Sequence, residues 1–171
     1  MTSLTPRSAH AMSTDDLLAL IAGRYQAAHR RVLPELIALA RKVEHVHHDV
    51  PAAPLGLADA LEHVALELDM HMQVEEAVVF RAMQQEIGSA LVHPIGVMRT
   101  EHQDYAAELD RVQELAHDFV PPVAACGSWR RLYQGVAELC AALREQMRLE
   151  NEVLFPRFEH GPAPRCTSAQ A

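Results

Sequence analysis

Histidine and glutamate recur at helical spacing along the apolar stretches of this sequence. His71 and Glu75 are four residues apart, so both side chains lie on one face of a helix. A surface ion pair is the alternative, but the two residues lie on an apolar stripe, which favours burial. His102 and Glu150 occupy comparable positions on two other stretches. Imidazole and carboxylate ligands without thiolate suit iron or manganese, with zinc as an alternative, so these four residues predict a metal site.

Helices must position these side chains. The apolar periodicity and the Pro and Gly breakers predict four helices, at about 13–48, 57–87, 94–119 and 128–159. Pro34 is expected to kink or restart the first helix. No segment has the alternation of a strand, and the short connections favour an all-α, up-down-up-down four-helix bundle. We expect this bundle to span residues 13–160, between disordered tails at 1–12 and 161–171.

The core-facing stripe of each helix follows from the alternating three- and four-residue steps of bundle cores. On the second helix the stripe contains Leu57, Leu61, Val64, Leu68, His71, Glu75 and Val78. On the fourth helix it contains Leu132, Val136, Leu139, Leu143, Gln146, Glu150 and Val153. The stripe of the third helix includes His102, and that of the first includes Gln26 and His29. Every helix therefore brings polar groups into the core.

These polar positions have similar depths in the bundle. At 1.5 Å per residue they lie about 12 to 24 Å from the end where the second helix meets the third, so one layer can contain them. His47 lies about 31 Å beyond Gln26 along the first helix and belongs at the opposite end. Burying two carboxylates with two imidazoles costs several kcal/mol unless the carboxylates are protonated or a cation compensates their charge. A metal ion removes this cost directly.

Composition limits the remaining functions. The formal net charge of −8, from 15 Lys and Arg against 23 Asp and Glu, opposes binding to nucleic acid. Residues 1–12 lack the apolar core of a signal peptide, and no run of about 18 apolar residues is present, so we expect a cytoplasmic protein without a membrane span. The three cysteines have no CxxC spacing, which favours reduced thiols. No nucleophile triad, phosphate loop or nucleotide motif is present, and enzymatic activity is left open.

Five segments carry a resemblance to a known family over residues 21–158. They read HRRVLPELIALARKVEHVH, GLADALEHVALELDMHMQVEEAVVF, PIGVMRTEHQDYAAEL, ACGSWRRLYQGV and LENEVLFPRF. In order and spacing they resemble the iron-centre repair branch of the hemerythrin-like (HHE) family. The resemblance implies a di-iron centre in which the first and third helices each supply a histidine. The second and fourth helices would each supply an HxxxE pair with a bridging glutamate.

Two positions depart from this ligand set, while the residues that match it are His71, Glu75, His102 and Glu150. Gln26 replaces the histidine of the first helix, and Gln146 replaces that of the fourth. The first and fourth helices are neighbours in an up-down bundle, so a pseudo-twofold arrangement gives one iron both of the lost histidines. We therefore predict one iron per chain, or an unequal di-metal site, rather than two equal irons.

The replaced positions leave alternatives open. Gln26 and Gln146 are weaker ligand candidates, and hydrogen bonds from them to Glu75 or Glu150, without any metal, are an equal alternative. His29 lies one turn from Gln26 and is a further candidate, as a substitute ligand.

The resemblance implies a function as well as a ligand set. It implies a non-haem iron protein of the nitrosative and oxidative stress response, acting in iron–sulfur cluster repair, with iron–sulfur proteins as partners. One alternative is a module that binds or senses O₂, NO or iron without turnover. Another is a metal-free bundle that serves protein interaction. We expect no nucleic-acid or membrane partner, and either a monomer or a homodimer.

Overall fold

The fold is built from helices wherever the chain is described. The computed structural model describes residues 6–85 and 91–159, and every regular element in these two ranges is helical. The elements are α1 (Pro6–His10), α2 (Thr14–Leu20), η1 (Ile21–Gln26), α3 (Ala27–Val46), α4 (Leu57–Val74), η2 (Glu75–Val79), α5 (Phe80–Gln84), α6 (Val92–Leu115), η4 (His117–Phe119), α7 (Gly127–Leu149), η5 (Glu150–Leu154) and α8 (Pro156–Glu159). The predicted all-α class is confirmed. None of the described helices combines the length and apolar character needed to cross a membrane.

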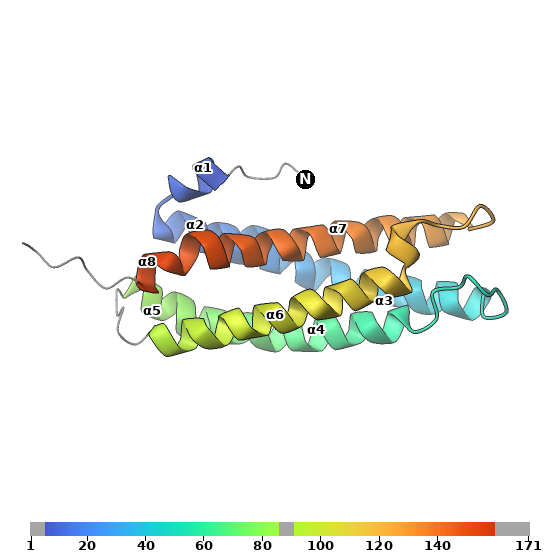
Figure 1. Ribbon diagram of the computed structural model, residues 1–171, viewed down its shortest axis with the longest axis horizontal. Coiled ribbons are helices and arrows are strands. Elements are labelled where there is room, and N and C mark those ends of the chain that lie inside the picture. Colours follow the sequence, from blue (N-terminus) through green and yellow to red (C-terminus); the bar gives the residue numbers. More distant parts are fainter. Residues whose placement is uncertain (1–5, 86–90, 160–171) are drawn as a thin grey trace, which may run out of the picture.

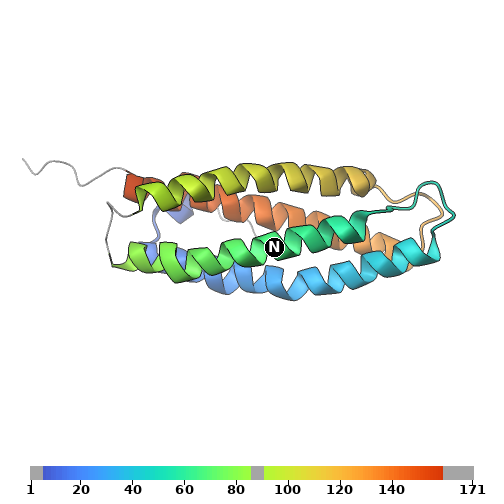
Figure 2. The same ribbon diagram turned by 90° about the horizontal axis from the view of Figure 1, so that it is seen from below.

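Consecutive helices join end to end into long rods that lie side by side (Figures 1 and 2). The rods are α2–η1–α3, α4–η2–α5, α6 alone, and α7–η5–α8. Helix α3 packs against α4 and α7, and α6 packs against the same two helices. The connections that follow α3 and α6 lie at the same end of the rods (Figure 1). Side chains from all the rods therefore meet in one interior.

The N-terminal boundary differs from the sequence-based expectation. Helix α1 occupies part of the stretch 1–12 that was expected to be a disordered tail, because Ala9 is fully buried against the rods. Ser13 caps α2 by accepting a hydrogen bond from the Asp16 amide at 3.1 Å. Helix α3 continues through Pro34 as one helix, so no restart occurs there. The expected tail at 161–171 lies outside the described residues.

Within the described chain, π-turns interrupt three of the rods at the depth of the predicted metal ligands. η1 ends at Gln26, η2 begins at Glu75, and η5 begins at Glu150. In these turns the backbone hydrogen bond spans five residues, as from the Phe155 amide to the Glu150 carbonyl at 2.8 Å. The extra residue delays the core-facing stripe by one position. The prediction that Val78 faces the core is therefore wrong: Val78 is 51% exposed, and Val79 is fully buried instead.

The buried side chains form two apolar clusters with a polar layer between them. One cluster contains Leu61, Trp129 and Val136, and the other contains Ile21 and Met98. The buried polar residues of the described chain are Gln26, His29, His71, Glu75, His102, Gln146 and Glu150. Close packing above and below this layer fixes the spacing of the rods and excludes water from the polar groups.

Candidate metal centre

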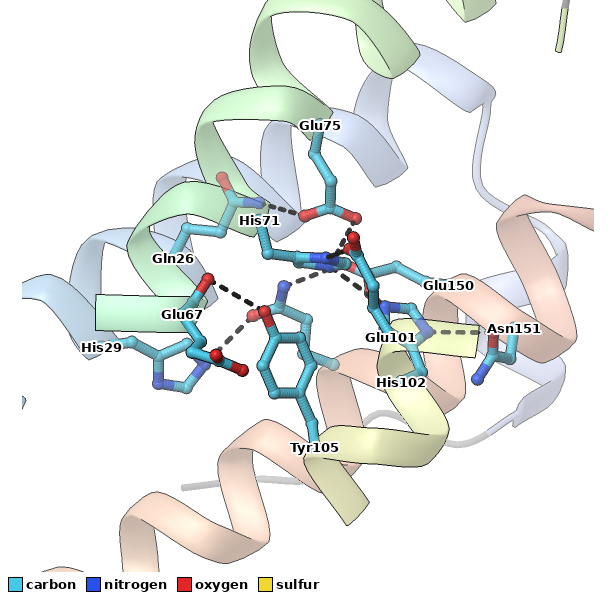
Figure 3. A network of polar contacts seen from close by, with 11 residues as sticks. Gln26, His29, Glu67, His71, Glu75, Glu101, His102, Tyr105, Glu150 and Asn151 are labelled. Carbon is cyan, nitrogen blue, oxygen red and sulfur yellow. Dashed lines mark hydrogen bonds and ion pairs between the residues drawn. The ribbon is translucent and has the colours of Figure 1, made fainter. Parts of the chain in front are cut away.

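Four buried side chains with metal-ligand chemistry converge from three rods (Figure 3). His71 lies in the last turn of α4, Glu75 opens η2, His102 lies within α6, and Glu150 opens η5. One donor atom from each residue lies within 4.8 Å of all the others. None of the four residues is more than 4% exposed. The fold thus brings together the same four residues that the sequence predicts as ligands.

The donor atoms face one another at short range. Nε2 of His71 and Nε2 of His102 are 3.2 Å apart. Nε2 of His102 lies 3.2 Å from Oε2 of Glu150, and Nε2 of His71 lies 3.5 Å from Oε1 of Glu75. Oε1 of Glu75 and Oε2 of Glu150 are both fully buried, and neither has a hydrogen-bond partner in the described chain. Buried charged oxygens without a donor are costly, so this donor set of two nitrogens and two oxygens fits a cation.

The pKa values in the cluster reflect charges that oppose one another. Burial raises the pKa of Glu75 well above its usual range, and the negative charge of Glu150 raises it further. Burial lowers the pKa of His71, but the neighbouring carboxylates of Glu75, Glu101 and Glu150 raise it by more. Without a metal ion, bound protons therefore compensate the negative charge of the two glutamates. A divalent cation does the same while leaving the imidazoles neutral and the carboxylates ionised.

Each histidine is oriented by a second hydrogen bond on its outer nitrogen. Nδ1 of His71 donates to Oε2 of Glu101 at 2.5 Å, and Nδ1 of His102 donates to Oδ1 of Asn151 at 3.0 Å. Arg99 holds Asn151 by donating to its backbone carbonyl at 3.0 Å. With the hydrogen of a neutral ring held on Nδ1 by these contacts, Nε2 has a lone pair to offer a cation at the centre of the cluster. The two rings differ, since one is backed by a carboxylate and the other by a neutral amide.

The two glutamines bind the glutamates rather than extending the donor cluster. Gln26 donates to Oε2 of Glu75 at 2.8 Å, and Gln146 donates to Oε1 of Glu150 at 2.9 Å. The hydrogen-bonding alternative for these residues is therefore the arrangement that the structure shows. His29 lies outside the cluster, with Nε2 3.0 Å from Oε1 of Gln146. Burial lowers the pKa of His29 to about 4, so its ring is neutral near pH 7.

Sequence reasoning missed the two residues that orient the histidines. Glu101 and Asn151 each adjoin a predicted ligand along the chain, but they lie at the edge of the apolar stripe. Periodicity gave no signal for either residue, because their role depends on which neighbouring helix their side chains reach. His47 lies far from the cluster, as predicted, and its ring contacts that of Trp129 at 4.9 Å between centroids.

A narrow cavity adjoins the cluster on the side of the two histidines. Its volume is about 10 Å³, which is close to the space that one water molecule requires. The lining is largely apolar and comes from α4, α6 and α7, with Leu68, Leu109 and Leu143 among its residues. Tyr105 also lines it, and its hydroxyl donates to the Glu67 carbonyl at 2.9 Å. A small uncharged molecule fits this space better than an ion does.

Fold and site together define a class: an all-α protein whose core holds imidazoles and carboxylates able to bind a metal ion. Comparison with known families agrees with this class. Residues 24–158 match the hemerythrin HHE cation binding domain. The chain therefore belongs to the hemerythrin HHE family.

Curated relatives cover most of this chain. The iron-sulfur cluster repair protein YtfE of Pectobacterium carotovorum subsp. carotovorum (strain PC1) is 44% identical over 146 residues, covering 85% of this chain and 66% of the relative. The protein of the same name from Dickeya chrysanthemi (strain Ech1591) is 42% identical over 149 residues, covering 87% of this chain and 67% of the relative. The chain spans about two thirds of the length of these relatives.

Proposed function

We propose that this chain is a non-haem iron protein of iron–sulfur cluster repair in the nitrosative and oxidative stress response. The observation that carries the proposal is a pair of buried glutamate oxygens that face two imidazole nitrogens and accept no hydrogen bond from the described part of the chain. The role in repair is supported by the names of the YtfE relatives. We also infer that the four rods form an up-down-up-down bundle, supported by the packing of α3 and α6 against α4 and α7.

We propose one iron per chain, held by His71, Glu75, His102 and Glu150. The support is the hydrogen bonding of the outer glutamate oxygens, which accept from Gln26 and Gln146. An oxygen that accepts an amide hydrogen at this distance has one lone pair fewer to offer a second ion. The buried imidazole of His29, the further ligand candidate, is hydrogen-bonded to Gln146.

The residues of the chain prepare the site for a cation. Bound iron supplies one-electron redox chemistry and open positions for a small ligand. Glu101 and Asn151 hold the two rings in the tautomer that directs Nε2 inward. The apolar clusters on either side exclude water, so the charges of the carboxylates are poorly screened and attract a cation strongly.

The second candidate is a module that binds or senses a diatomic gas such as O₂ or NO without turnover. The observation that favours it is the small apolar cavity beside His71 and His102. It uses the same iron, so iron content does not distinguish it from repair. Gas titration followed by visible spectroscopy, set against recovery of a damaged iron–sulfur enzyme, distinguishes the two.

Metal content per chain tests the site. Protein expressed with ample iron and purified without oxygen should contain about one iron by elemental analysis. Glu75→Ala and Glu150→Ala should each lose it, whereas Glu152→Ala, an exposed neighbour, should retain it. Gln26→His combined with Gln146→His should raise the content toward two. Absence of iron in the parent protein, with manganese and zinc also absent, would favour a metal-free interaction bundle, and unchanged iron in every variant would refute the ligand assignment.

A further inference from the structure

An apolar stripe is exposed along the outer face of α4 and η2. Leu66, Met70, Val74 and Val78 recur at four-residue intervals and are between 45% and 63% exposed. At 1.5 Å per residue the row is about 18 Å long, and neighbours at this spacing touch. Single exposed apolar residues are common on protein surfaces, but a continuous row marks a surface that another molecule covers. We call this row the α4 stripe.

A groove runs beside the α4 stripe, between α4 and α6, which lie side by side in Figure 2. Its volume is about 300 Å³. Met70 and Val74 line it from α4, Tyr105 lines it from α6, and His71 also forms part of its lining. The groove therefore joins the α4 stripe to the wall of the candidate metal centre.

The groove has an acidic rim. Glu67, Glu101 and Asp104 line it, and no described Lys or Arg forms an ion pair with any of the three. Their charges converge near the Tyr105 hydroxyl: burial raises the pKa of that group, and Glu101, Glu67 and Asp104 raise it further. Negative charge beside apolar side chains gives this face a defined complement, namely apolar side chains accompanied by positive charge.

We propose that the α4–α6 face docks a protein segment, helical and about three turns long, that carries an apolar row flanked by Lys or Arg. Such a segment places its apolar row on the α4 stripe and its cationic groups against Glu67 and Asp104. A second copy of this chain fits less well, because pairing this face with itself brings acidic rims together and each copy has a net charge of −8. The bound segment covers the groove that leads to His71, so a partner docked here lies next to the candidate metal centre.

This inference goes beyond the proposed function and does not depend on metal binding. All the residues that carry it lie on the surface of α4, η2 and α6, apart from His71 in the groove wall. The test for bound iron and the test for docking can therefore give negative results independently of each other.

Two labelled peptides test the complementarity. The first is an amphipathic helix of eighteen residues, about five turns, with a leucine face flanked by lysine; the second has glutamate in place of lysine. Fluorescence anisotropy with the full chain should show binding of the lysine peptide that weakens with added salt, and much weaker binding of the glutamate peptide. Equal binding of the two peptides, or no binding of either, would overturn the proposal.

Surface variants locate the peptide. Met70→Gln with Val74→Thr keeps the side-chain shapes but removes apolar character, and should weaken binding of the lysine peptide by about tenfold. Asp104→Lys should weaken it severalfold and reduce its salt dependence. The controls are Val123→Thr, which is exposed elsewhere, and Glu114→Lys, further along α6, and both should bind as the parent does. Equal loss in Glu114→Lys and Asp104→Lys would mean that the peptide senses only net charge and would refute this docking face. Equal loss in Val123→Thr and the Met70 and Val74 variant would refute it as well.

Cross-linking in cells identifies the natural occupant. A photo-reactive amino acid at position 78, compared with one at position 123, should join this chain to segments rich in Lys and Arg, read by mass spectrometry of the cross-linked peptides. Cross-links to acidic segments, or to α4 of a second copy together with a dimer that Met70→Gln and Val74→Thr dissociate, would overturn the proposal.

Discussion

The two histidines have unequal outer partners, so a substitution at Glu101 should change the affinity of the site for iron. Glu101→Gln converts the carboxylate behind His71 into an amide like the one Asn151 presents to His102. A hydrogen bond to a charged group contributes about 1.5 to 3 kcal/mol, against about 1 kcal/mol for a neutral one. The difference is about 0.5 to 2 kcal/mol, and because the Glu101 side chain is 40% exposed, water reduces it to about 0.5 to 1 kcal/mol. The iron dissociation constant should therefore rise about two- to fivefold.

Competition with a chromophoric iron(II) chelator at pH 7, without oxygen, measures this constant. Asn151→Asp is the converse change, and it should tighten binding by a similar factor, because Arg99, which also pairs with Glu159, already donates to Asn151 and lies beside the added charge. Glu114→Gln removes an acidic charge elsewhere on α6 and should leave the constant unchanged. An affinity of Glu101→Gln within twofold of the parent, with the Asn151→Asp affinity also unchanged, would refute the argument that the outer partners tune the ligands.

Two further predictions follow from the π-turns and from the buried cysteine. Deleting Val78 converts η2 to an ordinary α-helical turn and keeps the following residues in phase. Deleting Ala65 instead rotates all of the following helix by about 100°. The midpoint temperature of thermal unfolding should therefore fall much less for the Val78 deletion than for the Ala65 deletion. Burial raises the pKa of the Cys140 thiol to about 11, so at pH 8 it should resist alkylation until the protein is unfolded, whereas the exposed Cys126 should react at once. Site-resolved mass spectrometry after iodoacetamide treatment checks this, and rapid labelling of Cys140 in the folded protein would contradict its burial.

Glutamine, rather than histidine, at positions 26 and 146 has a structural consequence. A neutral imidazole with its hydrogen on the outer nitrogen offers only a lone pair to the centre, whereas a glutamine amide offers hydrogens to a carboxylate. Gln26 and Gln146 use these hydrogens to fix one oxygen of each glutamate. The other oxygen of each glutamate is left facing the imidazoles. The two glutamines thus give the polar layer a side where hydrogen bonds fix the carboxylates and a side where free oxygens face the imidazoles.

Much of the fold, and the four residues that meet in the buried cluster, were predictable because local patterns encode them. Apolar periodicity and helix breakers predicted the helices near their observed bounds, and the four-residue spacing of His71 and Glu75 placed both on one face. The failures occurred where a pattern was assumed to continue unchanged. Val78 was placed in the core because an α-helical period was applied across η2, and residues 1–12 were taken as a tail because they are too short to show any period.

The sequence by itself determined that each predicted helix carries a histidine or a glutamate on its apolar side, because side-chain direction on a helix depends only on spacing along the chain. Tertiary structure alone decided that Nδ1 of His71 meets Glu101 and that of His102 meets Asn151, because those contacts depend on how neighbouring helices are rotated about their axes. It also decided where the π-turns fall, since one extra residue in a turn is stable only when packing on both sides of the polar layer holds it.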